Sequence, residues 1–292
     1  MDFDHFEDFE LPVEFVDTHC HLDLNKFDND RTEVILRSQA AGLTHILIPS
    51  ISINSSRKAL KLAESNPMLF MSIGVQPNDA ITWDDQCIKN LREIHNSSLN
   101  VSPPVKKIIA IGEIGLDYYW DTSPHEHQKK ILWSQMELAT ELELPLIIHL
   151  REKQDVDHGE GADALLEIIN IWVKELKKKN NPLANHPGVL HSFSGDLDTA
   201  NQAIQLGFYI GVTGPVTYKN NKKRQDLIAS IPIENLLLET DAPFLTPHPK
   251  RGQRNEPANI PLVAAKIAEL HNKTLAEVAA QTCSNASRLF QW

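Results

Sequence analysis

The sequence predicts an α/β fold: a single-domain (β/α)8 TIM-type barrel with a metal site at the C-terminal ends of its strands. Eight short runs rich in Ile, Leu and Val alternate with amphipathic segments along the chain. The length, 292 residues, is usual for one such barrel domain. An open doubly wound sheet is the alternative, because a strand count cannot prove closure.

The apolar runs are continuous rather than alternating, which indicates strands covered on both faces, as in a parallel sheet. The expected strands are Val13–Asp17, His45–Pro49, Leu69–Val75, Lys107–Gly112, Pro145–His149, Gly188–His191, Tyr209–Val212 and Leu236–Glu239. Helical patterns lie between them. The expected helices are Arg31–Ala41, Ser55–Glu64, Ile88–His95, Pro124–Glu143, Ala162–Lys179, Asp198–Leu206, Pro261–Leu270 and Leu275–Leu289.

The charge and the cysteine content of the chain indicate which partners it can bind and whether its thiols are reduced. The 28 basic and 39 acidic residues give a formal net charge of −11, which argues against a broad basic face for duplex nucleic acid but permits a nucleic acid held locally by metal ions. The three cysteines, Cys20, Cys87 and Cys283, indicate reduced thiols.

The N-terminus lacks the basic and apolar segments of a signal peptide, and no apolar run approaches the roughly 20 residues that cross a bilayer. We therefore expect a cytoplasmic protein without membrane contact. We also expect a monomer. Residues 1–10 are expected to form a mobile acidic tail, and residues 11–292 the barrel.

The first expected strand leads into His19 and His21, which are two residues apart. Alternation in an extended segment places both imidazoles on one side, at a spacing that can chelate one metal ion. Cys20 between them faces away and is expected to pack in the core, and Asp17 is expected to support the site rather than to bind metal.

Later strands end in further ligand-type residues, and in a barrel these ends form the face that carries the chemistry. The additional candidates are Glu113, His149, His191 and Asp241. Together with His19 and His21 they supply enough nitrogen and oxygen ligands for two divalent ions, with Mg²⁺, Mn²⁺ and Zn²⁺ all open. Glu113 can bridge the ions, and Asp241 can bind one ion and accept a proton from water. Glu113 and Asp241 are therefore the candidate catalytic residues.

These motifs resemble the TatD family of metal-dependent deoxyribonucleases, within the amidohydrolase-like superfamily. The resemblance runs from about Glu14 to Leu289. It also includes Gln128, Ala139 and Arg151 around the fifth expected strand. The motifs that carry it are Asp17-Thr18-His19-Cys20-His21-Leu22-Asp23, Gly112-Glu113-Ile114-Gly115-Leu116-Asp117, His191-Ser192-Phe193-Ser194-Gly195, Glu239-Thr240-Asp241-Ala242-Pro243 and Arg254-Asn255-Glu256-Pro257.

The resemblance implies a TIM-type barrel with a two-metal site that hydrolyses DNA phosphodiesters, often from the 3′ end. It implies that Glu113 is shared by both ions. By position, one ion would be held by His19, His21, Glu113 and Asp241, and the other by Glu113, His149 and His191. Many relatives in the superfamily bridge their metals with a carbamylated lysine, and Glu113 in that place favours the TatD branch.

The chain departs from the family pattern after the third expected strand. Gln76 and Asn78 stand where the family usually has histidines. Both can hydrogen-bond, and Gln76 is kept as a candidate substrate contact, but neither can titrate near neutral pH. Rate or substrate preference can therefore differ from the family norm.

Several residues keep two interpretations. Arg151 can hold a phosphate or pair with a nearby carboxylate. Arg254 and Asn255 can contact phosphate or belong to a solvated loop. The segment Tyr118–Trp120 can stack a base of single-stranded DNA or pack as a lid. Asp23 and Asp117 can orient ligating imidazoles or stabilise local turns.

The ligand set predicts a divalent-metal-dependent hydrolase, and the family resemblance implies that it acts on DNA phosphodiesters. We expect a 3′–5′ exonuclease on single-stranded or frayed DNA that uses a metal-bridged hydroxide. One alternative is a small-molecule amidohydrolase that cleaves an ester, lactone or amide at the same two-metal site. Another is a non-catalytic metal-binding protein that kept the scaffold.

Overall fold

The computed structural model describes residues 13–99, 106–120 and 122–292. The expected mobile tail at residues 1–10 lies outside this part. The described chain forms one eight-stranded sheet in which strands adjacent in sequence are adjacent in space and parallel. The strands are β1 (Phe15–Asp17), β2 (Leu43–Ile48), β3 (Leu69–Ile73), β4 (Ile108–Asp117), β5 (Leu146–Arg151), β6 (Gly188–Leu190), β7 (Tyr209–Val212) and β8 (Leu236–Leu238).

The first and last strands meet and close the barrel. The Thr18 amide donates to the Leu238 carbonyl at 3.0 Å, and the Asp241 amide donates to the His19 carbonyl at 2.8 Å. Beyond them, Cys20 forms a parallel bridge with Ala242. These bonds exclude the open doubly wound sheet, and the predicted (β/α)8 barrel is confirmed.

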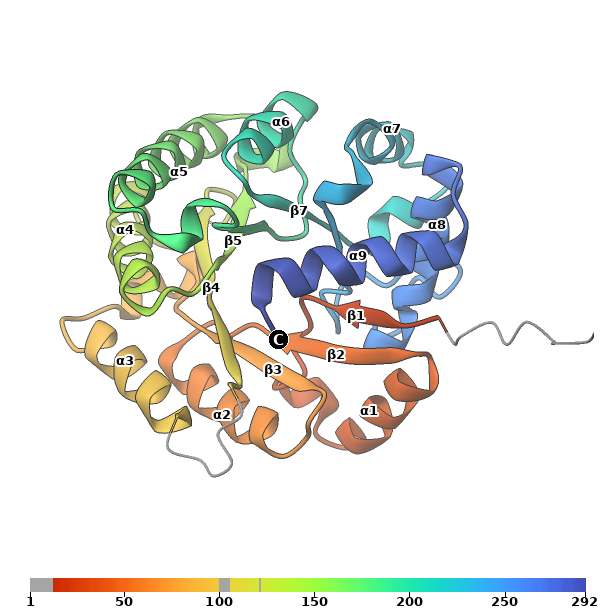
Figure 1. Cartoon of the computed structure of the whole chain (residues 1–292), viewed down its shortest axis with the longest axis horizontal. Coiled ribbons are helices and arrows are strands. Elements are labelled where there is room, and N and C mark those ends of the chain that lie inside the picture. Colours follow the sequence, from red (N-terminus) through yellow and green to blue (C-terminus); the bar gives the residue numbers. More distant parts are fainter. Residues whose placement is uncertain (1–12, 100–105, 121) are drawn as a thin grey trace, which may run out of the picture.

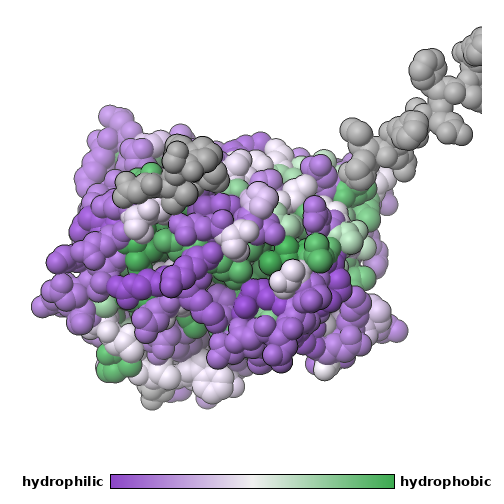
Figure 2. Space-filling model, turned by 90° about the horizontal axis from the view of Figure 1, so that it is seen from below, coloured by the Kyte–Doolittle hydropathy of each residue, from purple (hydrophilic) through white to green (hydrophobic). Residues whose placement is uncertain are grey.

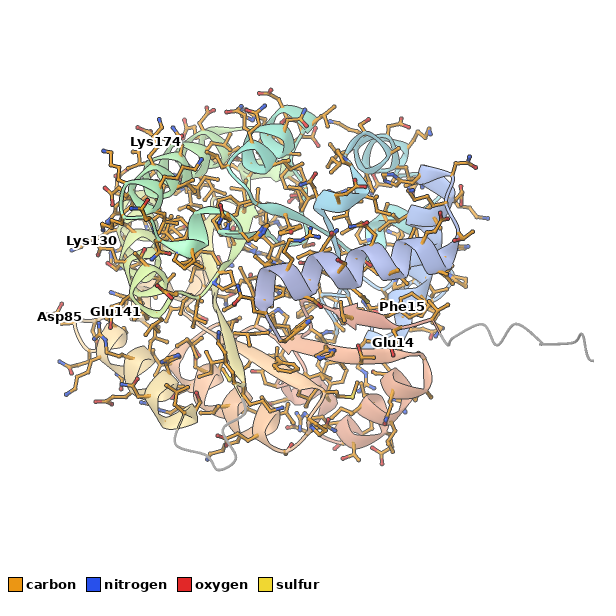
Figure 3. All side chains as sticks on the ribbon, viewed as in Figure 1. Glu14, Phe15, Asp85, Lys130, Glu141 and Lys174 are labelled. Atoms are coloured by element: carbon orange, nitrogen blue, oxygen red, sulfur yellow. The ribbon has the colours of Figure 1, made fainter. Side chains whose placement is uncertain are left out.

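Helices surround the strands (Figure 1). They are α1 (Arg31–Ala40), α2 (Ile53–Glu64), α3 (Cys87–Ser98), α4 (His125–Leu142), α5 (Glu160–Lys178), α6 (Leu197–Gln205), α7 (Lys222–Ser230), α8 (Ile260–His271) and α9 (Leu275–Phe290). Charged side chains such as Asp85, Lys130, Glu141 and Lys174 are exposed on this outer layer (Figure 3). Hydrophilic side chains also cover most of the face in Figure 2, with apolar ones gathered between them.

The barrel interior is filled by apolar side chains, and one end is closed by α9. Every strand contributes to this inner cluster, through Val16, Leu47, Phe70, Ile109, Ala110, Ile147, Val189, Tyr209 and Leu237. Leu289 and Phe290 of α9 belong to the same cluster. The Cys283 thiol of α9 donates to the carbonyl of Glu14, directly before β1, so α9 covers the N-terminal end of the barrel. The opposite end, where the strands finish, is therefore the one available for a site.

Several elements differ from the sequence prediction. Strand β4 continues five residues past Gly112 to Asp117, so Glu113 lies within a strand. Helix α2 begins at Ile53 because the Ser52 hydroxyl accepts from the Ser55 amide at 3.1 Å. Helix α7 was not predicted, since its first five residues are all polar and Ile228 is its one buried side chain. Among the described residues, no helix combines the length and apolar character needed to cross a membrane.

Candidate metal centre

The six expected ligands converge at the C-terminal end of the barrel. His19 and His21 follow β1, and their Nε2 atoms lie 3.3 Å apart. His149 near the end of β5 and His191 after β6 form a second pair, with His149 Nδ1 3.3 Å from His191 Nε2. The side-by-side placement predicted for His19 and His21 is therefore present in the structure.

Glu113 lies between the two histidine pairs and turns one carboxylate oxygen to each. Its Oε2 is 3.5 Å from His19 Nε2 and 3.7 Å from His21 Nε2. Its Oε1 is 2.9 Å from His149 Nδ1 and 3.2 Å from His191 Nε2. This is the geometry of a carboxylate able to bridge two ions.

Asp241, which follows β8 beside β1, adds a carboxylate to His19 and His21. Its Oδ1 lies 3.4 Å from His21 Nε2 and 3.7 Å from His19 Nε2. Asp241 has a left-handed backbone with φ of 53°, which is uncommon for a residue other than glycine and is frequent at functional sites. The hydrogen bond of its amide to the His19 carbonyl holds this conformation.

His149 is oriented by a carboxylate behind it. Its Nε2 lies 3.0 Å from Asp117 Oδ2, so Nδ1 is the atom that faces Glu113. Asp117 is held in turn by the Asn78 amide at 3.0 Å and by the Trp120 backbone amide at 3.1 Å. A carboxylate behind a ligating imidazole commonly fixes the ring and raises its basicity.

A glycine makes this approach of β4 and β5 possible. Gly115 has φ of 145°, and a Cβ atom there would lie 1.9 Å from the His149 carbonyl oxygen. Any side chain would therefore separate β4 from the strand that carries His149.

Burial and charge set the protonation of the centre. Burial and the neighbouring His191 lower the pKa of His19 to about 3, so His19 is neutral, as a ligand must be. Burial alone would favour a neutral Glu113, but His191, His149 and His19 hold the pKa of its carboxyl well below the usual range. The pKa of Asp241 is lowered in the same way by His21.

The centre attracts positive charge. Despite burial, the Asp241 and Glu113 carboxylates raise the pKa of His21 to about 9. Asp117 and Glu113 raise that of His149 to about 10, again against the effect of burial. A divalent cation would supply the positive charge that protons on these rings otherwise provide.

The donor set and its spacing fit such cations. Within the described part of the chain, two groups have ligand atoms within 4.8 Å of one another: His19, Glu113 and His191, and His19, His21 and Asp241. Ligand atoms about 2.0–2.2 Å from a shared ion lie roughly 3–3.5 Å apart, close to the distances above. Imidazole and carboxylate together suit Zn²⁺ or Mn²⁺.

A cavity of about 280 Å³ opens onto the centre. Its walls include His149, His191 and Asp241, and two cationic side chains, Arg151 and Arg224. The cavity therefore combines ligand-type groups with guanidinium groups, which bind phosphate well.

Arg151 pairs with a carboxylate, one of the two interpretations that the sequence left open, and its contact with phosphate stays a prediction. It lines the cavity, and its Nε donates to Asp155 Oδ1 at 2.9 Å. Its guanidinium also lies 3.7 Å from the centre of the Tyr119 ring. Tyr119 and Trp120 are exposed, whereas Tyr118 is buried and stacks on His125, so Tyr118 packs rather than presenting a face to substrate.

Two expected substrate contacts are engaged elsewhere. Asn255 is fully buried, and its amide donates to the Thr240 and Phe244 carbonyls at 2.9 and 2.7 Å. This burial disfavours a phosphate contact, and the substrate role of Asn255 stays a prediction. Arg254 donates to both carboxylate oxygens of Asp30 at 2.7 Å, an ion pair that accounts for its charge.

The remaining expected residues lie at the edges of the centre. The Gln76 amide donates to Asp79 Oδ2 at 3.0 Å, and its contact with substrate stays a prediction. Asp17 is buried and accepts from the His19 and Thr240 amides, in the supporting position expected of it. Cys20 packs in the core as predicted, and Asp23 accepts from the Ser55 hydroxyl.

Sequence reasoning missed Glu239 and Arg224. Glu239 is buried, accepts from the Ser192 amide at 2.7 Å and lies 3.9 Å from His191. Burial raises the pKa of its carboxyl well above the usual range. Glu239 lies two residues before Asp241, and side chains at that spacing in an extended segment share a face, so its place at the site was predictable. Arg224 comes from α7 and gave no such signal, because that helix was not predicted.

Comparison with known proteins agrees with this architecture. The family model described as TatD related DNase matches residues 16–291. The uncharacterized metal-dependent hydrolase YabD of Bacillus subtilis is 37% identical over 275 residues, which cover 94% of this chain and 98% of that protein. The 3′-5′ ssDNA/RNA exonuclease TatD of Cronobacter sakazakii is 33% identical, covering 94% of this chain and 97% of that protein.

A solved structure shows the same similarity in three dimensions. The crystal structure of YjjV, a TatD homologue from Escherichia coli K12, matches with a TM-score of 0.81 and 32% identity, covering 96% of this chain and 99% of that one. The resemblance seen in the motifs is therefore confirmed. The chain belongs to the TatD-related DNase family of metal-dependent hydrolases.

Proposed function

We propose that the protein is a divalent-metal-dependent 3′–5′ exonuclease that hydrolyses phosphodiester bonds in single-stranded or frayed DNA. The observation that carries this proposal is the position of Glu113, with one oxygen toward each histidine pair. The name of the Cronobacter sakazakii relative, a 3′-5′ ssDNA/RNA exonuclease, supports the same polarity.

Two divalent ions, Mg²⁺, Mn²⁺ or Zn²⁺, are the proposed cofactors. His19, His21 and Asp241 would hold one ion and His149 and His191 the other, with Glu113 between them. When bound, such ions lower the pKa of water and neutralise charge on phosphate oxygens. Asp117 would keep His149 Nδ1 turned toward its ion, through the contact at Nε2.

Side chains around the cavity would activate the water and bind the phosphate. Asp241 would orient the attacking water and accept its proton at a carboxylate oxygen. Arg151 and Arg224 line the same cavity and would bind the non-bridging phosphate oxygens. As water attacks phosphorus, the bond from phosphorus to the leaving oxygen breaks. That oxygen takes up a proton from solvent, and Asp241 returns to solvent the proton that it accepted.

The charge of the chain favours single strands as substrate. With a formal net charge of −11, the protein attracts nucleic acid through the metal centre and its two arginines rather than through a basic face. A cavity of about 280 Å³ fits part of one strand end rather than a duplex.

We further propose that the protein acts in the cytoplasm as a monomer.

Turnover on a 3′-labelled single-stranded DNA oligonucleotide tests the proposal. Chelator-stripped protein is assayed with and without Mg²⁺, Mn²⁺ or Zn²⁺, beside Asp241→Asn. We expect stepwise, metal-dependent shortening that the variant lacks. Protein that binds two ions yet leaves DNA intact with every metal would overturn the proposal and direct the search to ester and lactone substrates.

A further inference from the structure

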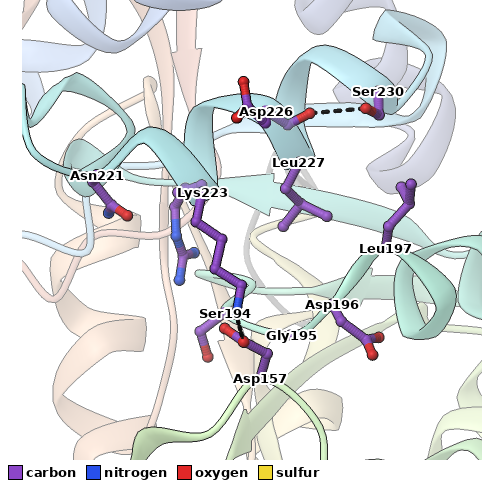
Figure 4. Close-up of a pocket in the computed structure, with 11 residues that line it drawn as sticks. Asp157, Ser194, Gly195, Asp196, Leu197, Asn221, Lys223, Asp226, Leu227 and Ser230 are labelled. Carbon is purple, nitrogen blue, oxygen red and sulfur yellow. Dashed lines mark hydrogen bonds and ion pairs between the residues drawn. The ribbon is translucent and has the colours of Figure 1, made fainter.

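A second cavity of about 280 Å³ lies beside the metal centre, at the same end of the barrel. It is formed where the segment after β6 faces helix α7 (Figure 4). Its walls include Asp157, Ser194, Leu197, Asn221, Arg224 and Leu227. The mechanism described above uses only Arg224 from this set.

The two cavities adjoin. Ser194 and Arg224 line both of them, so a strand that leaves the metal centre in this direction passes these two residues. Arg224 is partly buried and donates to the Phe193 carbonyl, which fixes its guanidinium at the boundary. A fixed guanidinium between two cavities is suited to the sugar–phosphate link between two nucleotides.

The lining of the second cavity favours a base over a phosphate. Leu197 and Leu227 supply apolar wall. The Asn221 side chain donates from Nδ2 to the Pro215 carbonyl at 3.2 Å, which turns its amide oxygen into the group that would accept from the polar edge of a base. Of the two cations, Lys223 pairs with Asp157, and Arg224 lies at the boundary with the first cavity, where it would bind the phosphate at the metal centre. The three aspartates on the wall would repel a phosphate.

Size and access agree with a single ring system. The volume is just below the ~300–1,000 Å³ of ordinary small-molecule sites, so it suits one base rather than a whole nucleotide. The Lys223–Asp157 ion pair crosses the cavity in Figure 4. Lys223 is largely exposed, and exposed pairs of this kind are weak, so a base can displace it.

We propose that this second cavity binds the nucleobase of the penultimate nucleotide while the phosphate that follows it occupies the metal centre. The inference rests on the proposed exonuclease function and extends it to substrate choice. A base inserted between α6 and α7 cannot be paired in a duplex, so the cavity selects single-stranded or frayed ends. Leu227 and Leu197 are the residues that determine this selectivity.

The test removes the base from the substrate and the cavity from the protein. Wild-type protein is compared with Leu227→Trp, which fills the cavity, and with Leu197→Trp, which fills it from the other helix. Ile171→Trp is the matched control, because Ile171 is an exposed apolar residue of α5 outside the cavity. Each protein cleaves an intact oligonucleotide and one with an abasic penultimate position. Thymidine 5′-(p-nitrophenyl phosphate), which lacks a second base, reports on the metal centre alone.

For wild type and Ile171→Trp we expect KM to rise about tenfold on the abasic oligonucleotide, which is within the effect of stacking one base. For Leu227→Trp and Leu197→Trp we expect the same raised KM on both oligonucleotides and wild-type turnover of the nitrophenyl ester. Binding of a labelled trinucleotide to metal-stripped protein, measured by fluorescence anisotropy, should weaken in the same two variants.

Two results would overturn the inference in distinguishable ways. Wild-type cleavage that ignores the abasic position, or filled variants that still respond to it, would remove the base site and leave the exonuclease intact. Wild-type protein that cleaves neither oligonucleotide nor nitrophenyl ester with any metal would overturn the exonuclease and the base site together.

Discussion

Asp117 Oδ2 lies 3.0 Å from Nε2 of His149, and this contact leaves Nδ1 as the atom that faces Glu113. His149 thus differs from His19, His21 and His191, whose Nε2 atoms face the carboxylates. The difference follows from the strand register, because β4 runs alongside β5 and carries Glu113 before, and Asp117 after, the residue paired with His149.

Replacing Asp117 with asparagine should weaken metal binding. The carboxylate that orients His149 is lost while the shape is kept, and such changes commonly cost about 10–100-fold in metal affinity or activity. Isothermal titration of Zn²⁺ or Mn²⁺ into stripped protein measures it. Asp23→Asn is the matched control, since Asp23 is buried but bonds to Ser55. Equal losses in both variants would contradict the orienting role.

Replacing Asn78 with alanine should produce a smaller loss in the same direction. The Asn78 amide donates to Asp117, and a hydrogen bond to a charged group contributes about 1.5–3 kcal/mol at most. We expect up to about tenfold weaker metal binding, below the loss for Asp117→Asn. Gln76→Ala serves as the comparison, because its partner is Asp79. If Gln76→Ala weakens metal binding more than Asn78→Ala does, the contacts from Asn78 through Asp117 to His149 do not support metal binding.

Replacing Glu113 with glutamine should disrupt the proposed pair of ions. The amide keeps the shape but has one acceptor oxygen, so it cannot turn an anionic oxygen toward both histidine pairs. We expect the metal content, measured by atomic emission after dialysis, to fall from two ions to one or fewer. DNA cleavage should fall about a thousandfold, in line with several kcal/mol of lost charge stabilisation. A variant that retains two ions would exclude Glu113 as the bridge.

Replacing Asn255 or Arg254 with alanine should lower the stability of the protein without weakening substrate binding. Asn255→Ala leaves the buried Thr240 and Phe244 carbonyls without their donor, and we expect the free energy of unfolding in urea to fall by about 2–3 kcal/mol. Arg254→Ala removes partly exposed ion pairs and should cost about 1 kcal/mol or less. Neither variant should change the salt dependence of DNA binding. A shallower salt dependence of DNA binding in Arg254→Ala would show that Arg254 contacts a phosphate.

The architecture and the ligand set were predictable because their signals are local. Continuous apolar runs mark buried parallel strands, and the rule that barrel sites form at strand ends then identifies His19, Glu113, His149, His191 and Asp241 by position alone. Spacing two apart in an extended segment also placed His21 beside His19. Helix α7 was not predicted, because only one of its residues, Ile228, is buried and the helix therefore has no apolar stripe.

The amino-acid sequence by itself therefore determined the barrel and which six side chains meet at its open end. Only the tertiary structure decided how they meet: the two directions of the Glu113 carboxylate, the ring of His149 turned by Asp117, the burial of Asn255, and the cavity shared through Arg224. The physical reason is that strand order and strand ends follow from hydrophobic patterning along the chain. Side-chain direction and burial instead depend on contacts between segments far apart in sequence, which no local pattern records.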